Sequence, residues 1–195
     1  MPPERYKLRN PGRKNKQVKT KEIILGVTAS IAIYKACDLV RRLKDKGYSV
    51  TVIQTRESEQ LISPLLFQSL SGSKVYRGLF DMPQDWDIEH IALADKADLV
   101  LIAPATANII AKIANGICND LLTCVVAATK SVVLIAPAMN ENMYKNKIMQ
   151  LNLKKLISLG YNFIGPKAGK LACGKPGIGC LSDIEEIVKR VGDLC

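Results

Sequence analysis

The feature that most constrains this chain is a regular alternation between short apolar runs and longer segments with helical spacing of apolar residues. The runs at 22–27, 48–55, 97–105, 131–138 and 161–166 have the length and composition of buried strands. The segments between them place apolar side chains three or four positions apart, as crossover helices do. Strands that are apolar throughout, and not only at alternate residues, predict a parallel sheet that is covered on both faces.

Helices are expected between and after these strands, at 30–47, 58–70, 106–116, 118–130, 142–160 and 183–191. Gly47 and the Ser71-Gly72 pair are suited to end the first two helices, and Pro64 interrupts the second. Residues 72–90 are expected to form a loop with short elements, and residues 167–182 a mobile glycine-rich loop. The sequence therefore predicts an α/β fold with a single-domain doubly wound parallel sheet, either Rossmann-like or flavodoxin-like, with right-handed crossovers.

The composition excludes disordered, membrane-spanning and secreted proteins as classes. The 195 residues are 48% apolar and 24% charged, which is enough to bury the core of one domain. No apolar run approaches the roughly 20 residues that cross a bilayer. The basic, polar N-terminus also lacks the apolar segment of a secretory signal. We therefore expect a cytoplasmic protein with no membrane partner.

Positive charge is concentrated at the N-terminus. The net charge is +10, and residues 1–20 contain seven basic side chains against the single acidic side chain of Glu4. We interpret residues 1–20 as a basic flexible extension and residues 21–195 as the folded domain. Because the extension has no aromatic residue besides Tyr6 and no recognisable binding motif, a nucleic-acid partner is not favoured. The milder positive charge of the body suits a phosphorylated ligand.

The cysteines do not form a metal-binding pattern. None of the six is spaced as C-x-x-C, and one histidine cannot complete a Cys/His zinc site, so no metal is expected. A disulfide framework is unnecessary at this length. Most of the cysteines are therefore expected to be small buried groups.

Small and hydroxyl-bearing residues follow four of the expected strands. They stand in the segments GVTASIA, TRES, PATAN and PAMNEN, at the strand ends where ligands bind to open parallel sheets. The first segment lacks the G-x-G-x-x-G pattern, but its hydroxyl groups and the N–H groups of the following helix suit a single phosphate. This favours a mononucleotide such as FMN over NAD. The alternative is that Ser30 only caps the helix.

Three residues near these strand ends could take part in a reaction. His90, the only histidine, precedes the strand at 97–105 and is either structural or a base for a thiol proton. Asn140 follows the strand at 131–138 and could hold a carboxylate or amide, cap the next helix, or do both. Cys173 lies among glycines, which suggests a lid that carries a thiol, although an incidental surface cysteine is the alternative. Four further residues are interpreted as helix-surface charges or packing residues, namely Lys35, Lys112, Met139 and Met143.

Five ordered segments together resemble a known family. They are GVTASIAIYK, LISPLLFQSLSG, IEHIALADKADLVLIAPATANIIAKIANGICNDLLT, PAMNENMY and LACGKPGIGC, and the resemblance covers residues 21–193. In order and spacing they are similar to the flavin-containing cysteine decarboxylases, above all to the phosphopantothenoylcysteine decarboxylases, which include one half of a bifunctional coenzyme A biosynthesis protein. The resemblance implies a Rossmann-like domain that assembles as a homotrimer, sometimes further into a dodecamer, with FMN between subunits.

The activity that this resemblance implies is FMN-dependent decarboxylation of 4'-phospho-N-pantothenoyl-L-cysteine to 4'-phosphopantetheine, a carboxy-lyase step of coenzyme A biosynthesis. In this family the substrate thiol is oxidised to a thioaldehyde, CO2 is lost to leave an enethiolate, and the electrons are then returned. The net reaction is therefore not a redox reaction.

The resemblance also implies a role for individual residues. His90 matches a histidine that assists removal of the thiol proton, and Asn140 an asparagine that binds the carboxylate or amide of the substrate. Cys173 matches a cysteine in a substrate-recognition flap that protonates the enethiolate. Asn108 and Met143 join Asn140 as implied substrate contacts. The implied FMN contacts lie in four loops and are Ala29, Ser30, Ile31, Thr55, Thr106, Ala107, Asn108, Ile109 and Ala138.

The chain departs from the family pattern at a few positions. Ala29 stands where glycine is common, Tyr144 where many relatives have tryptophan, and Cys180 where an arginine that could contact the flap or a phosphate is frequent. The chain ends at Cys195 without a synthetase domain, so we expect either a monofunctional enzyme or part of a fused protein.

Two related functions remain as alternatives. A peptidyl-cysteine decarboxylase that modifies a precursor peptide would share His90 and Asn140. Such enzymes tend to lack the LACG flap, so Cys173 favours a small-molecule substrate. A non-catalytic, flavin-binding regulatory subunit would usually have lost a catalytic residue, whereas all three candidates are present here.

Overall fold

A six-stranded sheet forms the centre of the computed structural model, which describes residues 20–79 and 88–195. Its strands are β1 (Glu22–Val27), β2 (Ser49–Gln54), β3 (Val75–Tyr76), β4 (Leu99–Ala105), β5 (Val132–Pro137) and β6 (Asn162–Phe163). They lie in the order β3-β2-β1-β4-β5-β6, and every neighbouring pair is parallel. This is the Rossmann order, so the structure selects one of the two predicted fold types.

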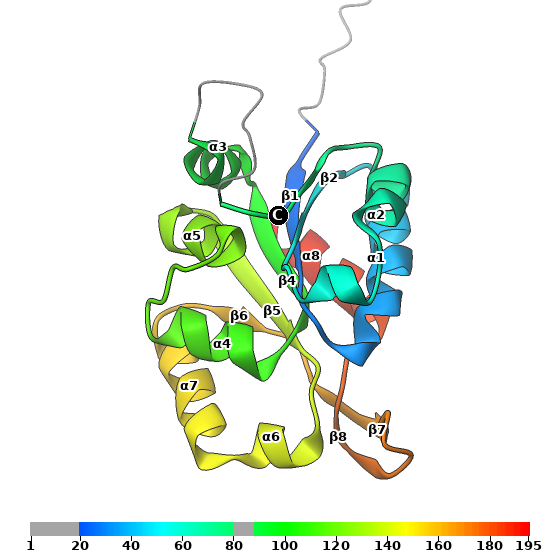
Figure 1. The fold of residues 1–195 in the computed structure, drawn as a ribbon, viewed down its shortest axis with the longest axis vertical. Coiled ribbons are helices and arrows are strands. Elements are labelled where there is room, and N and C mark those ends of the chain that lie inside the picture. The colour runs from blue at the N-terminus through cyan, green and yellow to red at the C-terminus, as the bar shows by residue number, and fades with distance from the viewer. Residues whose placement is uncertain (1–19, 80–87) are drawn as a thin grey trace, which may run out of the picture.

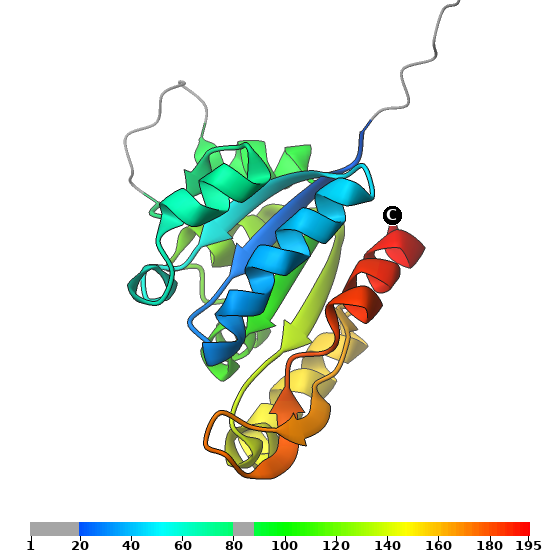
Figure 2. The same cartoon turned by 90° about the vertical axis from the view of Figure 1, so that its right-hand side faces the viewer.

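Helices cover both faces of the sheet, as its apolar strands require (Figure 1, Figure 2). One face carries α1 (Tyr34–Asp45), α2 (Pro64–Ser71) and α8 (Ile184–Leu194). The other carries α3 (Glu89–Lys96), α4 (Ala107–Ala114), α5 (Leu121–Ala128) and α7 (Lys147–Ser158). Alternate strand residues enter the two cores, since Leu25 of β1 joins the first and Ile24 the second, and both are fully buried. The predicted doubly wound α/β domain is confirmed.

Two of the expected helices are interrupted by residues that cap a new helix. The segment expected at 58–70 consists of the 3-10 turn η2 (Ser58–Gln60) and α2, and Ser63 caps α2. The segment expected at 142–160 consists of α6 (Glu141–Lys145) and α7, because the Asn146 side chain accepts the N–H of Ile148 at 2.9 Å. The apolar pattern continues through the second break, so the pattern alone does not reveal it.

The glycine-rich segment 167–182 contains an antiparallel hairpin, which corrects the prediction of a loop. β7 (Lys167–Lys170) pairs with β8 (Pro176–Cys180) in a small sheet of its own. The turn is closed by the N–H of Leu171, which donates to the carbonyl of Lys175 at 2.9 Å. The hairpin lies near the carboxyl end of the main sheet, far from α3 (Figure 1). Glycine permits flexibility, but it also permits the close approach of two backbones, and here the second property applies.

The remaining predictions concern the ends of elements and the chain segments around them. Gly72 ends α2 in a left-handed conformation, as expected. Between residues 72 and 90 the structure contains β3 and the start of α3, whereas residues 80–87 lie outside the described residues. The predicted extension lies outside them too, except for Thr20. In the described parts of the chain, no helix has the length and apolar character needed to cross a bilayer.

Candidate functional site

One buried hydroxyl group joins the carboxyl ends of β1 and β4. Thr28, directly after β1, is 2% exposed. Its Oγ1 donates to the carbonyl of Pro104 at 2.7 Å and accepts from the N–H of Thr106 at 3.1 Å. These bonds fix the loop after β4 against the loop after β1. Two of the predicted ligand loops therefore face the same crevice, in fixed relative positions.

A cavity of about 280 Å³ opens at this junction. It includes the first turn of α4, where Thr106 caps the helix by accepting the N–H of Ile109 at 3.4 Å. The N–H groups of a first helical turn have no partner within the helix, and together with hydroxyl groups they suit an anion. The lining residues are Thr28, Ala29, Thr55, Glu57, Thr106, Asn108, Ile109, Lys112, Asp120 and Met143. We call this the smaller cavity.

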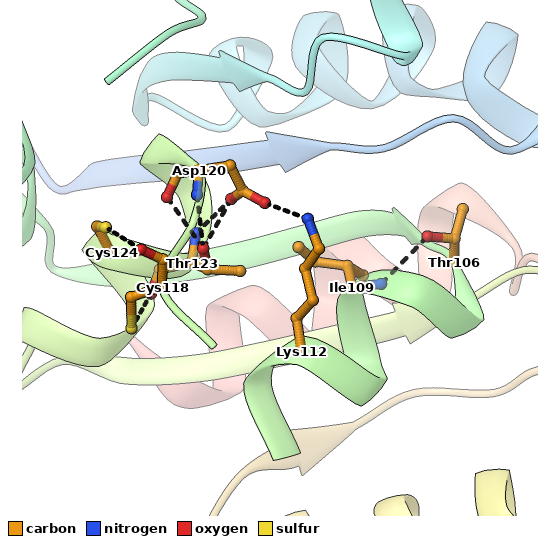
Figure 3. A network of polar contacts seen from close by, with 7 residues as sticks. All are labelled: Thr106, Ile109, Lys112, Cys118, Asp120, Thr123 and Cys124. Carbon is orange, nitrogen blue, oxygen red and sulfur yellow. Dashed lines mark hydrogen bonds and ion pairs between the residues drawn. The ribbon is translucent and has the colours of Figure 1, made fainter. Parts of the chain in front are cut away.

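An ion pair forms part of the wall of the smaller cavity (Figure 3). Lys112 Nζ lies 2.8 Å from Asp120 Oδ2, and the two side chains are 21% and 25% exposed. Asp120 also caps α5 by accepting the N–H of Thr123 at 2.8 Å, so α5 begins at Leu121 and not near residue 118 as expected. The interpretation of Lys112 as a simple helix-surface charge is therefore wrong, because it faces both Asp120 and the cavity.

A larger cavity, of about 580 Å³, adjoins the smaller one, since Ala29, Thr106 and Met143 line both. Its walls are mostly apolar with a few hydroxyl, amide, thiol and ammonium groups, a combination typical of cofactor and substrate sites. The lining residues are Ala29, Ser30, Ile31, Ala32, Tyr34, Lys35, Thr106, Ala107, Ala138, Met139, Asn140, Met143, Lys170, Leu171, Ala172, Cys173, Gly179, Cys180 and Leu181.

Besides Thr106, two lining residues of the larger cavity also cap helical segments. Ser30 caps the 3-10 turn η1 (Ile31–Ile33) by accepting the N–H of Ala32 at 3.3 Å. Asn140 caps α6, since its Oδ1 accepts the N–H of Asn142 at 2.8 Å. The capping bond uses the amide oxygen of Asn140 and leaves its NH2 group as a donor for a ligand. Asn140 can therefore cap the helix and bind a ligand at the same time, as the sequence allowed.

The hairpin forms one wall of the larger cavity and is attached to the loop after β5. The N–H of Met139 donates to the carbonyl of Gly179 at 3.0 Å. Gly179 has a φ of +147°, and a Cβ atom added there would lie 2.1 Å from the carbonyl oxygen of Met139, so this position requires glycine. The turn of the hairpin carries Cys173, which is exposed and lines the cavity.

A carboxylate on α6 adds a second attachment for the hairpin. Glu141 Oε1 accepts the N–H of Ile178 in β8 at 3.4 Å and lies 2.8 Å from Lys145 Nζ. The hydrogen bond from Lys145, followed by that from Ile178, lowers the pKa of the Glu141 carboxyl below its ordinary value. Glu141 therefore stays ionised at neutral pH and links the loop that carries Asn140 to the strand beside Cys173.

His90 lies away from these groups within one chain. It is a half-buried residue of α3 and lines neither cavity. α3 lies near the end of the sheet at which β1 begins (Figure 1). Both cavities are at the opposite end, since they are lined by Ala29 and Thr106, which follow the carboxyl ends of β1 and β4. A single chain therefore brings Asn140 and Cys173 to one cavity, but it does not bring His90 there.

The comparisons with known proteins agree with this geometry. The family model described as Flavoprotein matches residues 11–194. The chain belongs to the Flavoprotein family. A Streptococcus mutans protein named "Probable phosphopantothenoylcysteine decarboxylase" is 44% identical over 174 residues, which are 88% of this chain and 97% of that protein.

Two further matches extend the description of this Flavoprotein family member. The Vibrio cholerae "Coenzyme A biosynthesis bifunctional protein CoaBC" is 46% identical over 168 residues, which are 86% of this chain but only 42% of that protein. The chain thus spans less than half the length of this bifunctional relative. A solved structure of a PPC decarboxylase variant complexed with pantothenoylaminoethenethiol has a TM-score of 0.78 and 28% identity, and the match covers 89% of this chain and 97% of that one.

Most of the residues that the sequence proposed for the Flavoprotein site lie together. Every implied FMN contact lines one of the two cavities, as do the implied substrate contacts Asn108, Asn140 and Met143 and the flap residue Cys173. Met139, expected to be a packing residue, lines the larger cavity and also packs against the second core. Sequence reasoning missed several lining residues, among them Tyr34, Lys35, Lys112, Asp120 and Lys170. The signal for Lys112 was available, because it lies one helical turn after Asn108 on the same face of α4.

Proposed function

We propose that this chain is an FMN-dependent decarboxylase that converts 4'-phospho-N-pantothenoyl-L-cysteine to 4'-phosphopantetheine. The observation that carries the proposal is the larger cavity, which is lined by Asn140, by Cys173 and by residues of the expected flavin loops. The match to nearly the whole of a relative that is named a probable phosphopantothenoylcysteine decarboxylase supports the same activity.

The two adjoining cavities fit FMN in their chemistry. The smaller cavity offers hydroxyl groups, the first turn of α4 and the Lys112 ammonium, which suit a phosphate. The larger cavity offers apolar walls, including Ile31, Ala107 and Ala138, which suit a flat aromatic ring. When bound, FMN supplies a reversible two-electron oxidation of the carbon–sulfur group of the substrate.

The residues of this chain would then position the substrate and move protons. The NH2 group of Asn140 donates a hydrogen bond to the substrate carboxylate or amide and orients the bond that breaks. As CO2 leaves the thioaldehyde, the electron pair of the broken bond passes to sulfur and gives an enethiolate. The Cys173 thiol donates a proton to carbon, and the resulting thiolate regains a proton from solvent.

His90 would act from a second copy of the chain. It lines neither cavity of its own chain, so the proposed role in removing the thiol proton requires a neighbouring subunit. Apolar side chains beside it on the same segment are available for such a contact, since Ile88 is 64% exposed and Ile91 42%. The Lys74–Glu89 ion pair, at 2.8 Å, holds the segment after α2 beside the start of α3. A trimer, alone or within a dodecamer, is the assembly we propose.

The direct test is to incubate the purified protein with 4'-phospho-N-pantothenoyl-L-cysteine and to detect 4'-phosphopantetheine and CO2 by mass spectrometry. The flavin released on denaturation should have the mass of FMN and not of riboflavin or FAD. Turnover only of a peptide with a C-terminal cysteine would instead identify a peptidyl-cysteine decarboxylase. Bound FMN without turnover of either substrate would leave a flavin-binding subunit and refute the proposed activity.

The origin of His90 can be tested by complementation. His90→Asn and Cys173→Ser are each expected to abolish product formation and to keep FMN bound. If each site takes His90 from one chain and Cys173 from its neighbour, co-expression of the two variants should restore part of the activity. If both residues act from the same chain, every mixed site lacks one of them and activity stays absent, which would refute the shared site.

A further inference from the structure

Among the residues that the structure describes, those that line the larger cavity include two cations and no carboxylate. Lys35 lies at the start of α1 and Lys170 at the end of β7, and every other lining residue is uncharged. Neither ammonium group forms an ion pair with the residues of the described ranges 20–79 and 88–195. In contrast, Lys112 in the smaller cavity forms an ion pair with Asp120. The larger cavity therefore has an uncompensated positive charge that can attract an anion.

The carboxylate near Lys35 is already engaged by another lysine. Asp183 forms an ion pair and a hydrogen bond with Lys167. That hydrogen bond is the main reason why the pKa of Asp183 is lowered. The positive charge of Lys35 lowers this pKa least. Asp183 is thus paired with Lys167, and the positive charge of Lys35 is available to a ligand.

Lys170 is placed by the same hairpin that carries the proton donor. It precedes Cys173 by three residues, and its backbone is paired with Pro176 across the hairpin. The thiol of Cys180 donates to the carbonyl of Lys170 at 3.5 Å, which adds a side-chain bond to that pairing. An anion bound by Lys170 would therefore lie beside the turn that carries Cys173.

We propose that Lys170, assisted by Lys35, binds the phosphate group of the substrate and so determines the preference for phosphorylated cysteinyl substrates. The inference rests on the proposed function. A cation would be poorly suited to hold the reacting carboxylate, because it stabilises the charge that must be lost as CO2. The phosphate keeps its charge through the whole reaction, so a lysine can hold it in the ground state and the transition state alike.

Binding of the phosphate should affect KM and not kcat. An interaction that is equal in the ground state and the transition state lowers KM and leaves kcat unchanged. Lys170→Met should therefore raise KM for the phosphorylated substrate about tenfold or more, as the loss of a charge-assisted hydrogen bond does. The kinetics of the unphosphorylated analogue, N-pantothenoyl-L-cysteine, should not change.

The experiment compares both substrates in the FMN-bound wild type and three variants. Lys175→Met is the matched control, since Lys175 lies on the same hairpin but does not line the cavity. Lys170→Arg keeps the charge and should keep most of the preference for the phosphorylated substrate. Binding of 4'-phosphopantetheine and of pantetheine, followed by calorimetry, gives a second readout that does not depend on turnover.

The outcomes separate this inference from the proposed function. A phosphate site at Lys170 would be refuted if Lys170→Met raised KM equally for both substrates or left the preference for the phosphorylated substrate unchanged. It would also be refuted if Lys175→Met changed KM in the same way as Lys170→Met. Wild-type protein that turns over neither substrate would refute the proposed function itself. A wild type that shows no preference between the substrates would leave the decarboxylase activity standing and overturn the phosphate site.

Discussion

The two adjoining cavities differ in how they are built. The smaller cavity is formed by strand ends, helix starts and the loops between them, and its walls include the buried residues Thr28 and Ile109. The larger cavity has one wall on the β7–β8 hairpin, a separate two-stranded sheet. A cofactor that stays bound benefits from a pocket that is fixed by the fold, whereas a substrate needs a wall that can be positioned independently. Changes in the two cavities should therefore separate flavin retention from turnover.

The largest separation is expected for Gly179→Ala. The new Cβ atom would lie 2.1 Å from the carbonyl oxygen of Met139, so the hairpin must move away from its attachment. Misplacement of a catalytic group by about 1 Å costs on the order of 100-fold in rate, and we expect a loss of that size in kcat. FMN absorbance of the purified variant should remain at the wild-type level, because neither the smaller cavity nor Ile31 and Ala107, which we assign to the flavin ring, belongs to the hairpin.

Gly47→Ala is the control for Gly179→Ala. Gly47 also has a positive φ, +88°, but an added Cβ atom meets nothing within 4 Å. It should lower the melting temperature slightly through backbone strain and leave kcat unchanged. If Gly179→Ala also keeps its kcat, or loses FMN together with activity, the hairpin is not an independent wall of the site.

The opposite result is expected for Thr28→Val, which acts on the smaller cavity. The substitution keeps the shape of the side chain but leaves the carbonyl of Pro104 and the N–H of Thr106 without their buried partner. A loss of about 2 kcal/mol in the free energy of unfolding is expected, measured by urea denaturation of the FMN-free protein. FMN affinity should fall as well, because the loops after β1 and β4 are no longer fixed to each other. Thr28→Ser keeps the hydroxyl group and should retain both properties, and equal destabilisation by Ser and Val would exclude the hydroxyl as the cause.

The difference in how the two cavities are built also explains how much of the site could be predicted from the sequence. Residues such as Ser30, Thr106 and Ala138 follow strands, and a parallel sheet necessarily brings strand ends to one edge, so the flavin loops could be found from the pattern. The hairpin could not, because its glycine-rich sequence has no strand periodicity, and its attachment to the loop after β5 is a contact between Gly179 and Met139 that no local pattern encodes. The ion pair between Lys112 and Asp120 could not be predicted for a similar reason, since it depends on the cap that Asp120 forms at the start of α5.

A charge change in the smaller cavity should have a moderate and selective effect. Lys112→Met removes the cation that we assign to the phosphate of FMN, and FMN affinity is expected to fall about tenfold. Riboflavin, which lacks the phosphate, should bind as it does to the wild type, and both affinities can be measured by fluorescence titration of the FMN-free protein. Asp120→Asn keeps a capping oxygen and releases Lys112, so FMN affinity should not fall. Equal losses for FMN and riboflavin would contradict the assignment of the phosphate to this cavity.

The smallest effect is expected at the second attachment of the hairpin. Because the pKa of Glu141 is lowered in the folded protein, its stabilising contribution is complete above the ordinary pKa of a glutamate and is lost as the pH falls through the lowered value. The hydrogen-exchange protection factor of the Ile178 amide should therefore decrease in the wild type below about pH 4. In Glu141→Gln this protection factor should be lower at neutral pH by less than about fivefold, as expected for an exposed pair, and it should not decrease further in acid.

Glu185→Gln is the control, since it removes an exposed ion pair with Arg42 away from the hairpin. It should leave the protection factor of the Ile178 amide unchanged. A wild-type protection factor that is independent of pH would show that Met139 and Gly179 hold the hairpin without help from Glu141.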